Sequence, residues 1–232
     1  MVTAIVLINV KHGHINDVAE NLLAMHGVSE VYSVGGRYDL VAIIRVKTNE
    51  EMADVVLAVH SYAGMLGTAV ADRLTQRLSH LVYVDAVVPK PGESWSSTHA
   101  SATREARLAA AAASPDHSFP PPDPAVFGLQ GADHDWVQRR QTPHPGHTYL
   151  APLHFDPRRV AQVPRTFINC SRPPLATIDV IRTRVCDPRF WDGAWLPGAR
   201  VLELITGHDP MISAPQALTG LLLDCLQPSK LN

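Results

Sequence analysis

The sequence predicts an α/β protein in two parts, a small β-α-β-β-α segment followed by a parallel sheet with a lid insertion. Three observations lead to this fold class. The first 50 or so residues alternate strand-like and helix-like patterns in that order. An apolar run then ends at His60-Ser61 and passes directly into a helical pattern. Beyond this turn, apolar strands alternate with helices, which is typical of a parallel sheet.

The first segment is predicted from its periodicity. Residues 3–10 form a β-rich run, and apolar residues recur within 14–26 at the spacing of an amphipathic helix. Residues 28–34 and 40–46 predict a hairpin, in which Gly35 and Gly36 supply the positive φ of the turn. This order is the beginning of a ferredoxin-like unit, and a fourth strand is expected to close it.

The next stretch supports two structures at once. Thr48 or Asn49 followed by acidic residues is a sound helix start. The same chain, continued through VVLAV, is the buried strand that leads to Ser61. One backbone cannot adopt both over residues 51–59, so we expect two sequence histories to meet near 53–56, in a fusion or recombinant chain.

The rest of the chain predicts the parallel sheet. Residues 81–88, 165–170 and 200–205 are apolar strands, and 214–226 is an amphipathic closing helix. Between the first two strands, residues 89–164 hold an alanine run and a proline-rich tract, as expected for a lid.

Composition limits location and partners. The chain is 46% hydrophobic and 18% charged, and its formal charge of −2 predicts neither a nucleic acid nor an anionic membrane as a partner. No apolar run approaches the ~18 residues that span a bilayer. The apolar start lacks the basic region of a signal peptide, and the three cysteines form no CxxC pair. We therefore expect a cytoplasmic protein.

Residues 1 to about 56 resemble the ligand-binding domain of the Lrp/AsnC transcription regulators, through the hairpin VSEVYSVGGRYDLVAIIRV and the helix expected after it. The resemblance implies a domain at 1–53 that binds amino-acid-like effectors and self-associates. No helix-turn-helix is present to read DNA. The closing strand is missing, so an exposed sheet edge favours homo-oligomerisation or aggregation.

Residues from about 54 to 226 resemble the α/β-hydrolase superfamily, in its branch of small-molecule esterases related to plant methylesterases and hydroxynitrile lyases. The motifs are DVVLAVHSYAGM, LVYVDAVVPKPGES, RRQTPHPGHTYLAPL and LITGHDPMISAPQALTGLLL. This resemblance implies a domain at 54–228 without the early strands and the oxyanion-hole loop. One departure lies in the G-x-S-x-G motif, whose first glycine is Val59.

Ser61 and His208 are the predicted nucleophile and base. A serine hydroxyl needs an adjacent base, and His208 follows the last predicted strand, as the chain order of these hydrolases implies. The acid has two candidates. Asp85 ends the strand after the Ser61 helix and is favoured, whereas Asp179 is the nearest carboxylate after the strand at 165–170. The acid would hold the imidazole in one tautomer.

The expected oxyanion hole is incomplete. The backbone N–H of Tyr62 is one donor, and the second belongs to the missing loop. Lid residues offer apolar surface to a small ester: Trp136, Tyr149, Leu150 and Phe155. No metal site or cofactor is expected from four scattered histidines: His134, His144, His147 and His154.

Two functions follow from these patterns. The favoured one is a serine hydrolase that acts on a small carboxylic ester, with cyanohydrin lyase chemistry open on the same residues. The alternative is a catalytically inert fusion, in which the first segment binds an amino-acid-like effector or mediates oligomerisation. Turnover of a simple ester distinguishes the two.

Overall fold

The structure is a computed structural model that describes residues 2–8, 15–24, 28–33, 40–46 and 55–225. It divides into two compact units, Met1–Asp54 and Val55–Asn232. The sequence predicts domains at 1–53 and 54–228, and their independence as folding units stays a prediction.

The first unit is a helix and a three-stranded antiparallel sheet. Its elements are β1 (Val2–Ile8), α1 (Ile15–Leu23), β2 (Val28–Ser33) and β3 (Leu40–Val46). Both outer strands pair with β3, which gives the order β1-β3-β2. This arrangement confirms the truncated ferredoxin-like segment. The Gly35-Gly36 turn and the helix expected from Thr48 or Asn49 lie outside the described residues.

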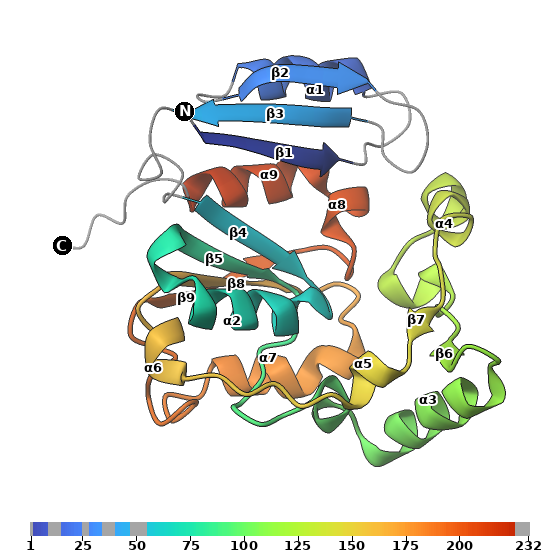
Figure 1. Ribbon diagram of the computed structural model, residues 1–232. Coiled ribbons are helices and arrows are strands. Elements are labelled where there is room, and N and C mark those ends of the chain that lie inside the picture. Colours follow the sequence, from blue (N-terminus) through green and yellow to red (C-terminus); the bar gives the residue numbers. More distant parts are fainter. Residues whose placement is uncertain (1, 9–14, 25–27, 34–39, 47–54, 226–232) are drawn as a thin grey trace. The chain divides into compact units, whose positions relative to one another are not determined.

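The second unit is built on four parallel strands. They are β4 (Val55–His60), β5 (Leu78–Val84), β8 (Arg165–Cys170) and β9 (Ala199–Leu204). The order in the sheet is β4-β5-β8-β9 (Figure 1). The sheet confirms the predicted fold class. Of the two structures that the sequence allows before Ser61, the strand is the one adopted from Val55 onward.

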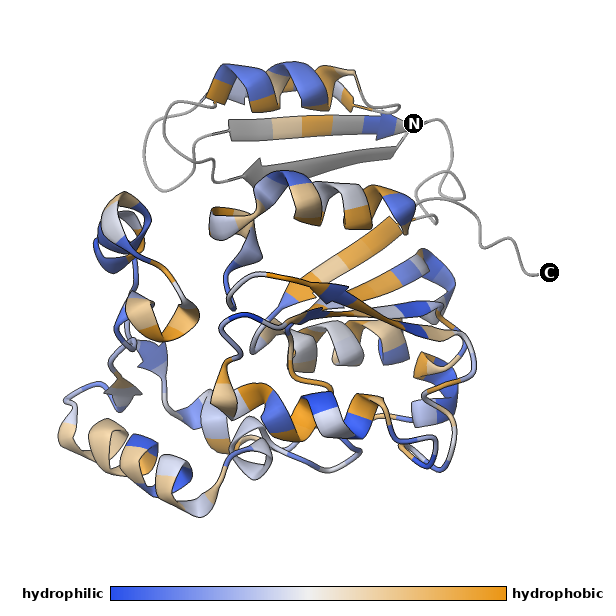
Figure 2. Ribbon diagram, turned by 180° about the vertical axis from the view of Figure 1, so that it is seen from behind, coloured by the Kyte–Doolittle hydropathy of each residue, from blue (hydrophilic) through white to orange (hydrophobic). Residues whose placement is uncertain are grey.

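Helices cover both faces of this sheet (Figure 1). One face packs against α2 (Ala63–Arg73) and α7 (Asp179–Val185), and the other against α9 (Pro215–Asp224). Successive strand residues point to opposite faces. Leu81 and Tyr83 therefore enter the first layer while Val82 and Val84 enter the second. Figure 2 shows apolar colour along β4 and β5 and on parts of the helices that cover the sheet.

Short elements fill the segment between β5 and β8, as predicted for an insertion. They are η2 (Trp95–Thr98), α3 (Ser101–Ala113), β6 (Ser118–Phe119), η3 (Pro124–Phe127), α4 (Gly131–Gln138), β7 (His144–Pro145), α5 (His147–Leu150) and α6 (Pro157–Val160). We call residues 89–164 the lid segment. Three further short helices complete the unit: η1 (Thr75–Arg77), η4 (Ala176–Ile178) and α8 (Pro210–Ser213).

Two remaining features concern the helices and the cysteines. Among the described residues, no helix combines the length and apolar character needed to cross a bilayer. The three cysteines are free thiols, with Cys170 and Cys225 buried and Cys186 exposed.

Candidate active site

Ser61 lies on a tight turn between β4 and α2. The strand ends at His60 and the helix begins at Ala63, so Ser61 adopts a left-handed backbone with φ of 54°. A non-glycine residue in this region is strained unless its surroundings fix it. Here the N–H of Val87 donates to the Ser61 carbonyl at 2.9 Å, and the Ser61 N–H donates to Val84 at 3.4 Å. The end of β5 therefore holds the turn.

Val59 is accommodated by a glycine one helical turn into α2. A Cβ built on Gly67 would lie 2.8 and 2.9 Å from the two methyl carbons of Val59. The valine methyls thus occupy the space that a side chain at 67 would need. The departure from the G-x-S-x-G motif is compensated by this small residue on the facing helix.

This compensation predicts that the effect of Gly67→Ala on the free energy of unfolding changes sign when Val59 is replaced by alanine. Gly67→Ala should destabilise the protein by about 1 to 3 kcal/mol, because its methyl group overpacks against Val59. In a Val59→Ala background the same substitution should be neutral or stabilising by up to about 1 kcal/mol, because alanine favours the helix. Urea unfolding of the four proteins measures the coupling.

Gly64→Ala is the matched control for this cycle. Its Cβ would lie 2.0 Å from the backbone oxygen of Val87, which Val59→Ala does not move. The control should therefore stay destabilising in both backgrounds. Equal effects of Gly67→Ala in both backgrounds would contradict the account.

His208 reaches Ser61 from the loop after β9. Its Nε2 lies 3.0 Å from the Ser61 Oγ, and only 2% of the residue is exposed. The backbone N–H of His208 donates to the Phe127 carbonyl of the lid segment at 3.1 Å, and the two rings are 5.3 Å apart. The sheet thus delivers the imidazole, and the lid segment covers it.

Asp85 is the carboxylate that contacts His208. Its Oδ2 accepts a hydrogen bond from the His208 Nδ1 at 2.7 Å, and the residue is completely buried. The Asp85 N–H donates to Ile168 at 2.8 Å, which ties its φ of 40° to the neighbouring strand. Asp179 lies apart from this chain of contacts. Its side chain is 64% exposed and pairs with Arg182 at 2.7 Å.

Tyr62 occupies the N-cap of α2, so its backbone N–H lies at the helix end that favours negative charge. Its partly exposed ring lies 4.9 Å from the rings of both Trp95 and His144, which are also partly exposed. These three rings form an aromatic surface beside Ser61. Sequence reasoning gave Trp95 no role, because only the folded lid segment brings it to the turn.

The lid residues expected at this surface do not gather there. Tyr149 is buried and lies 5.2 Å from the Trp95 ring, behind the aromatic surface. Phe155 packs edge-on against Trp191 in the core, and Leu150 is exposed. Trp136 stacks with Arg140 on α4 instead. Within the described part of the chain, Tyr149 is the only one of these four lid residues whose ring contacts a ring of the aromatic surface.

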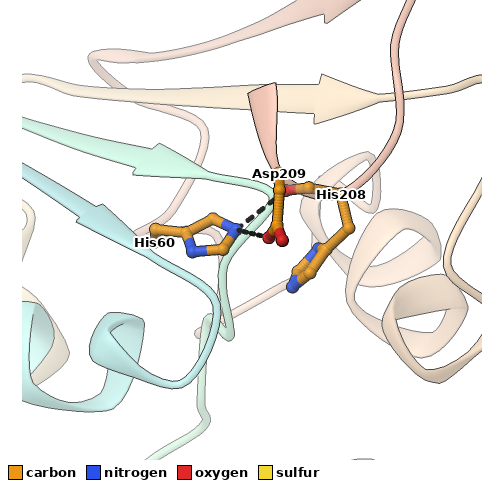
Figure 3. Close-up of side chains that lie close together, drawn as sticks. All are labelled: His60, His208 and Asp209. Carbon is orange, nitrogen blue, oxygen red and sulfur yellow. Dashed lines mark hydrogen bonds and ion pairs between the residues drawn. The ribbon is translucent and has the colours of Figure 1, made fainter. Parts of the chain in front are cut away.

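His60 and Asp209 lie close to His208, with the Asp209 carboxylate between the two histidine rings (Figure 3). The His60 Nε2 donates to the His208 carbonyl at 2.8 Å and lies 3.6 Å from the Asp209 carboxylate. Burial, followed by the neighbouring His208, lowers the pKa of His60 to about 4, and burial raises the pKa of Asp209. His60 is therefore neutral at pH 7 and fixes the loop that carries His208.

The described residues hold one group with metal-ligand geometry, formed by His60, His208 and Asp209. The Nε2 of His60 cannot be a ligand there while its proton goes to the carbonyl, because a carbonyl oxygen only accepts. Because its partner is the neutral carbonyl oxygen of His208, we interpret this His60 contact as one that positions the loop of His208. Of the four histidines considered from the sequence, His134 pairs with Asp123 and Asp135, and His144 with Thr148.

Comparison with known proteins shows that most of the chain is similar to an esterase. The chain is 32% identical over 177 residues to the carbendazim hydrolyzing esterase of Nocardioides sp. (strain SG-4G), which covers 73% of this chain and 70% of the relative. A solved extracellular α/β-hydrolase from a Paenibacillus species covers 76% of this chain and 74% of its own, with a TM-score of 0.60 and 17% identity. The latter likeness concerns the fold.

The first unit matches another family. Residues 3–68 fit the Lrp/AsnC ligand binding domain. The HTH-type transcriptional regulator FL11 of Pyrococcus abyssi (strain GE5 / Orsay) is 40% identical over 65 residues, which are 28% of this chain and 43% of the regulator. This match runs past residue 55 into β4 and α2. The structure places residues 55–60 of this match in the parallel sheet and residues 63–68 in the helix that follows.

Proposed function

Because the chain belongs to the α/β-hydrolase family and is an ester hydrolase of that family, we propose that it cleaves a small carboxylic ester with a serine mechanism. Ser61 is the nucleophile, His208 the general base and Asp85 the acid that orients the base. The comparisons support the reaction class, and the contacts among these three side chains support the mechanism.

The hydrogen bond between His208 and Asp85 carries the proposal. A carboxylate only accepts, so the Nδ1 of His208 holds the proton and its Nε2 keeps a lone pair. That lone pair faces the Ser61 hydroxyl at 3.0 Å. As the Ser61 Oγ attacks the ester carbonyl, its proton passes to Nε2 and then to the leaving alcohol, which yields an acyl-enzyme that water hydrolyses.

The Tyr62 N–H is the donor that we assign to the developing oxyanion. Tyr62 is the N-cap of α2, and the dipole of this helix adds to the same stabilisation. Removing a donor of this kind costs about 10² to 10³ in kcat, so we expect this N–H to contribute about that factor.

The aromatic surface of Tyr62, Trp95 and His144 favours esters with a flat apolar part. Such a group can stack on these partly exposed rings while its carbonyl carbon meets Ser61. Carbendazim, for which the Nocardioides relative is named, is a reasonable second assay substrate after a simple aryl ester.

A fluorophosphonate probe tests the mechanism without knowledge of the substrate. It phosphonylates a serine hydroxyl that a base has activated, and mass spectrometry of the digested protein locates the label. We expect the label on the peptide that contains Ser61, together with hydrolysis of p-nitrophenyl acetate. A folded protein that neither takes the label nor turns over the ester would overturn the proposal.

The match of residues 3–68 favours a second function beside the first. We propose that the first unit binds an amino-acid-like effector or mediates self-association. Light scattering after size-exclusion chromatography, with and without a mixture of the twenty amino acids, measures both. A monomer under all conditions, with no binding by calorimetry, would argue against this role.

A further inference from the structure

Arg182 joins the two carboxylates that the sequence offers as the acid. It lies on α7, and its Nη2 donates to Asp85 at 3.1 Å from Oδ1 and 3.3 Å from Oδ2. Its Nη1 donates to Asp179 at 2.7 Å. One guanidinium therefore connects an exposed carboxylate to the buried carboxylate that contacts His208.

The guanidinium is held in place by further acceptors. Its Nε donates to the Asn169 side chain at 2.7 Å, its Nη1 to the Leu175 carbonyl at 2.8 Å, and its Nη2 to the Cys170 carbonyl at 3.1 Å. Only 15% of the side chain is exposed. A planar fork with this many fixed partners is rigid, and so it fixes the carboxylate it contacts.

Asp85 needs this partner because it is completely buried. An ionised carboxylate removed from water is costly unless it is paired. Before the reaction His208 is a neutral donor to it, and the Cys170 N–H lies 3.4 Å away. Arg182 adds the full positive charge that offsets the burial.

We propose that Arg182 is a positioning residue of the active site, which holds the buried carboxylate of Asp85 aimed at His208 and thereby sets the acid limit of activity. This inference rests on the proposed function, because it assumes that Asp85 and His208 work as a pair.

The sign of the effect follows from the charges. A serine mechanism loses activity on the acid side when its general base is protonated, and a positive charge nearby opposes that protonation. Removing the charge should move the loss to higher pH. The other titratable groups near the pair remain in place. They are the neutral His60, Asp209, and the Cys170 thiol, whose pKa burial and then Asp85 raise to about 12.

Three variants separate the effect of the positive charge of Arg182 from the effect of its planar, forked shape. Arg182→Met removes both, Arg182→Lys keeps the charge without the fork, and Asp179→Asn alters only the exposed end of the bridge. The readout is the second-order rate of fluorophosphonate labelling at Ser61 from pH 4.5 to 9. This rate reports the base directly and needs no substrate.

For Arg182→Met we expect the acid limb to move to higher pH, with a plateau about tenfold lower. For Arg182→Lys the plateau should fall while the acid limb stays. Asp179→Asn should give no upward movement, because it removes a negative charge. Near-UV circular dichroism checks folding, and Arg182→Gln replaces the methionine variant if that variant unfolds.

Two failures are distinguishable. Labelling at Ser61 with the same acid limb in Arg182→Met or Arg182→Gln as in the wild type would overturn the inference alone, and would leave Arg182 a structural residue. A folded wild type that takes no label would overturn the proposed function and this inference with it.

Discussion

Replacing Ser61 with alanine should abolish fluorophosphonate labelling and lower kcat for p-nitrophenyl acetate by about 10⁶. The expectation follows from the 3.0 Å contact between the Ser61 Oγ and the His208 Nε2, which makes this hydroxyl the activated one. The protein should stay folded. Alanine removes no contact on which the turn depends, because the backbone of Ser61, and not its side chain, makes the hydrogen bonds that hold the turn.

Ser101→Ala is the matched control, since this serine is exposed at the start of α3. It should label and turn over the ester like the wild type. Residual activity above one hundredth in Ser61→Ala would mean that another group performs the attack. Loss of labelling in both variants would point to a folding defect instead.

The elements of the parallel sheet could be predicted closely from the sequence. The apolar run within β5 identified this strand, because a strand buried on both faces is largely apolar. Shorter runs of apolar residues identified β8 and β9, although β9 lies at the edge of the sheet and is only partly buried. Ser61 and His208 could be placed together for a related reason. The carboxyl ends of parallel strands meet at one edge of the sheet, and each residue follows such an end.

Other features depended on contacts between distant segments. The choice between Asp85 and Asp179 rests on the contact between Asp85 and His208, which are 123 positions apart in the sequence, and no local pattern reveals it. The fit of Val59 depends on Gly67, and the aromatic surface on the course of the lid segment. The local sequence of residues 55–60 is compatible with a helix and with a strand. Only the pairing with β5 selects the strand.

Replacing Asp85 with asparagine should lower kcat by about 10⁴, because it favours the wrong tautomer of His208. Arg182 can only donate, so it attracts the amide oxygen of the new side chain. The amide NH₂ then faces the His208 Nδ1, which must accept. The ring proton moves to Nε2, and the lone pair that should receive the Ser61 proton is lost.

The bridge through Arg182 makes this prediction testable in two ways. Asp179→Asn should cost less than about tenfold, because exposed ion pairs contribute little. Arg182→Met should cost less in the Asp85→Asn background than in the wild type, since the amide oxygen is then free to turn to His208 and restore the working tautomer. Equal losses for Asp85→Asn and Asp179→Asn would contradict the assignment of the acid. Strictly additive losses for Arg182→Met and Asp85→Asn would contradict the tautomer argument, because residues in one network are expected to couple.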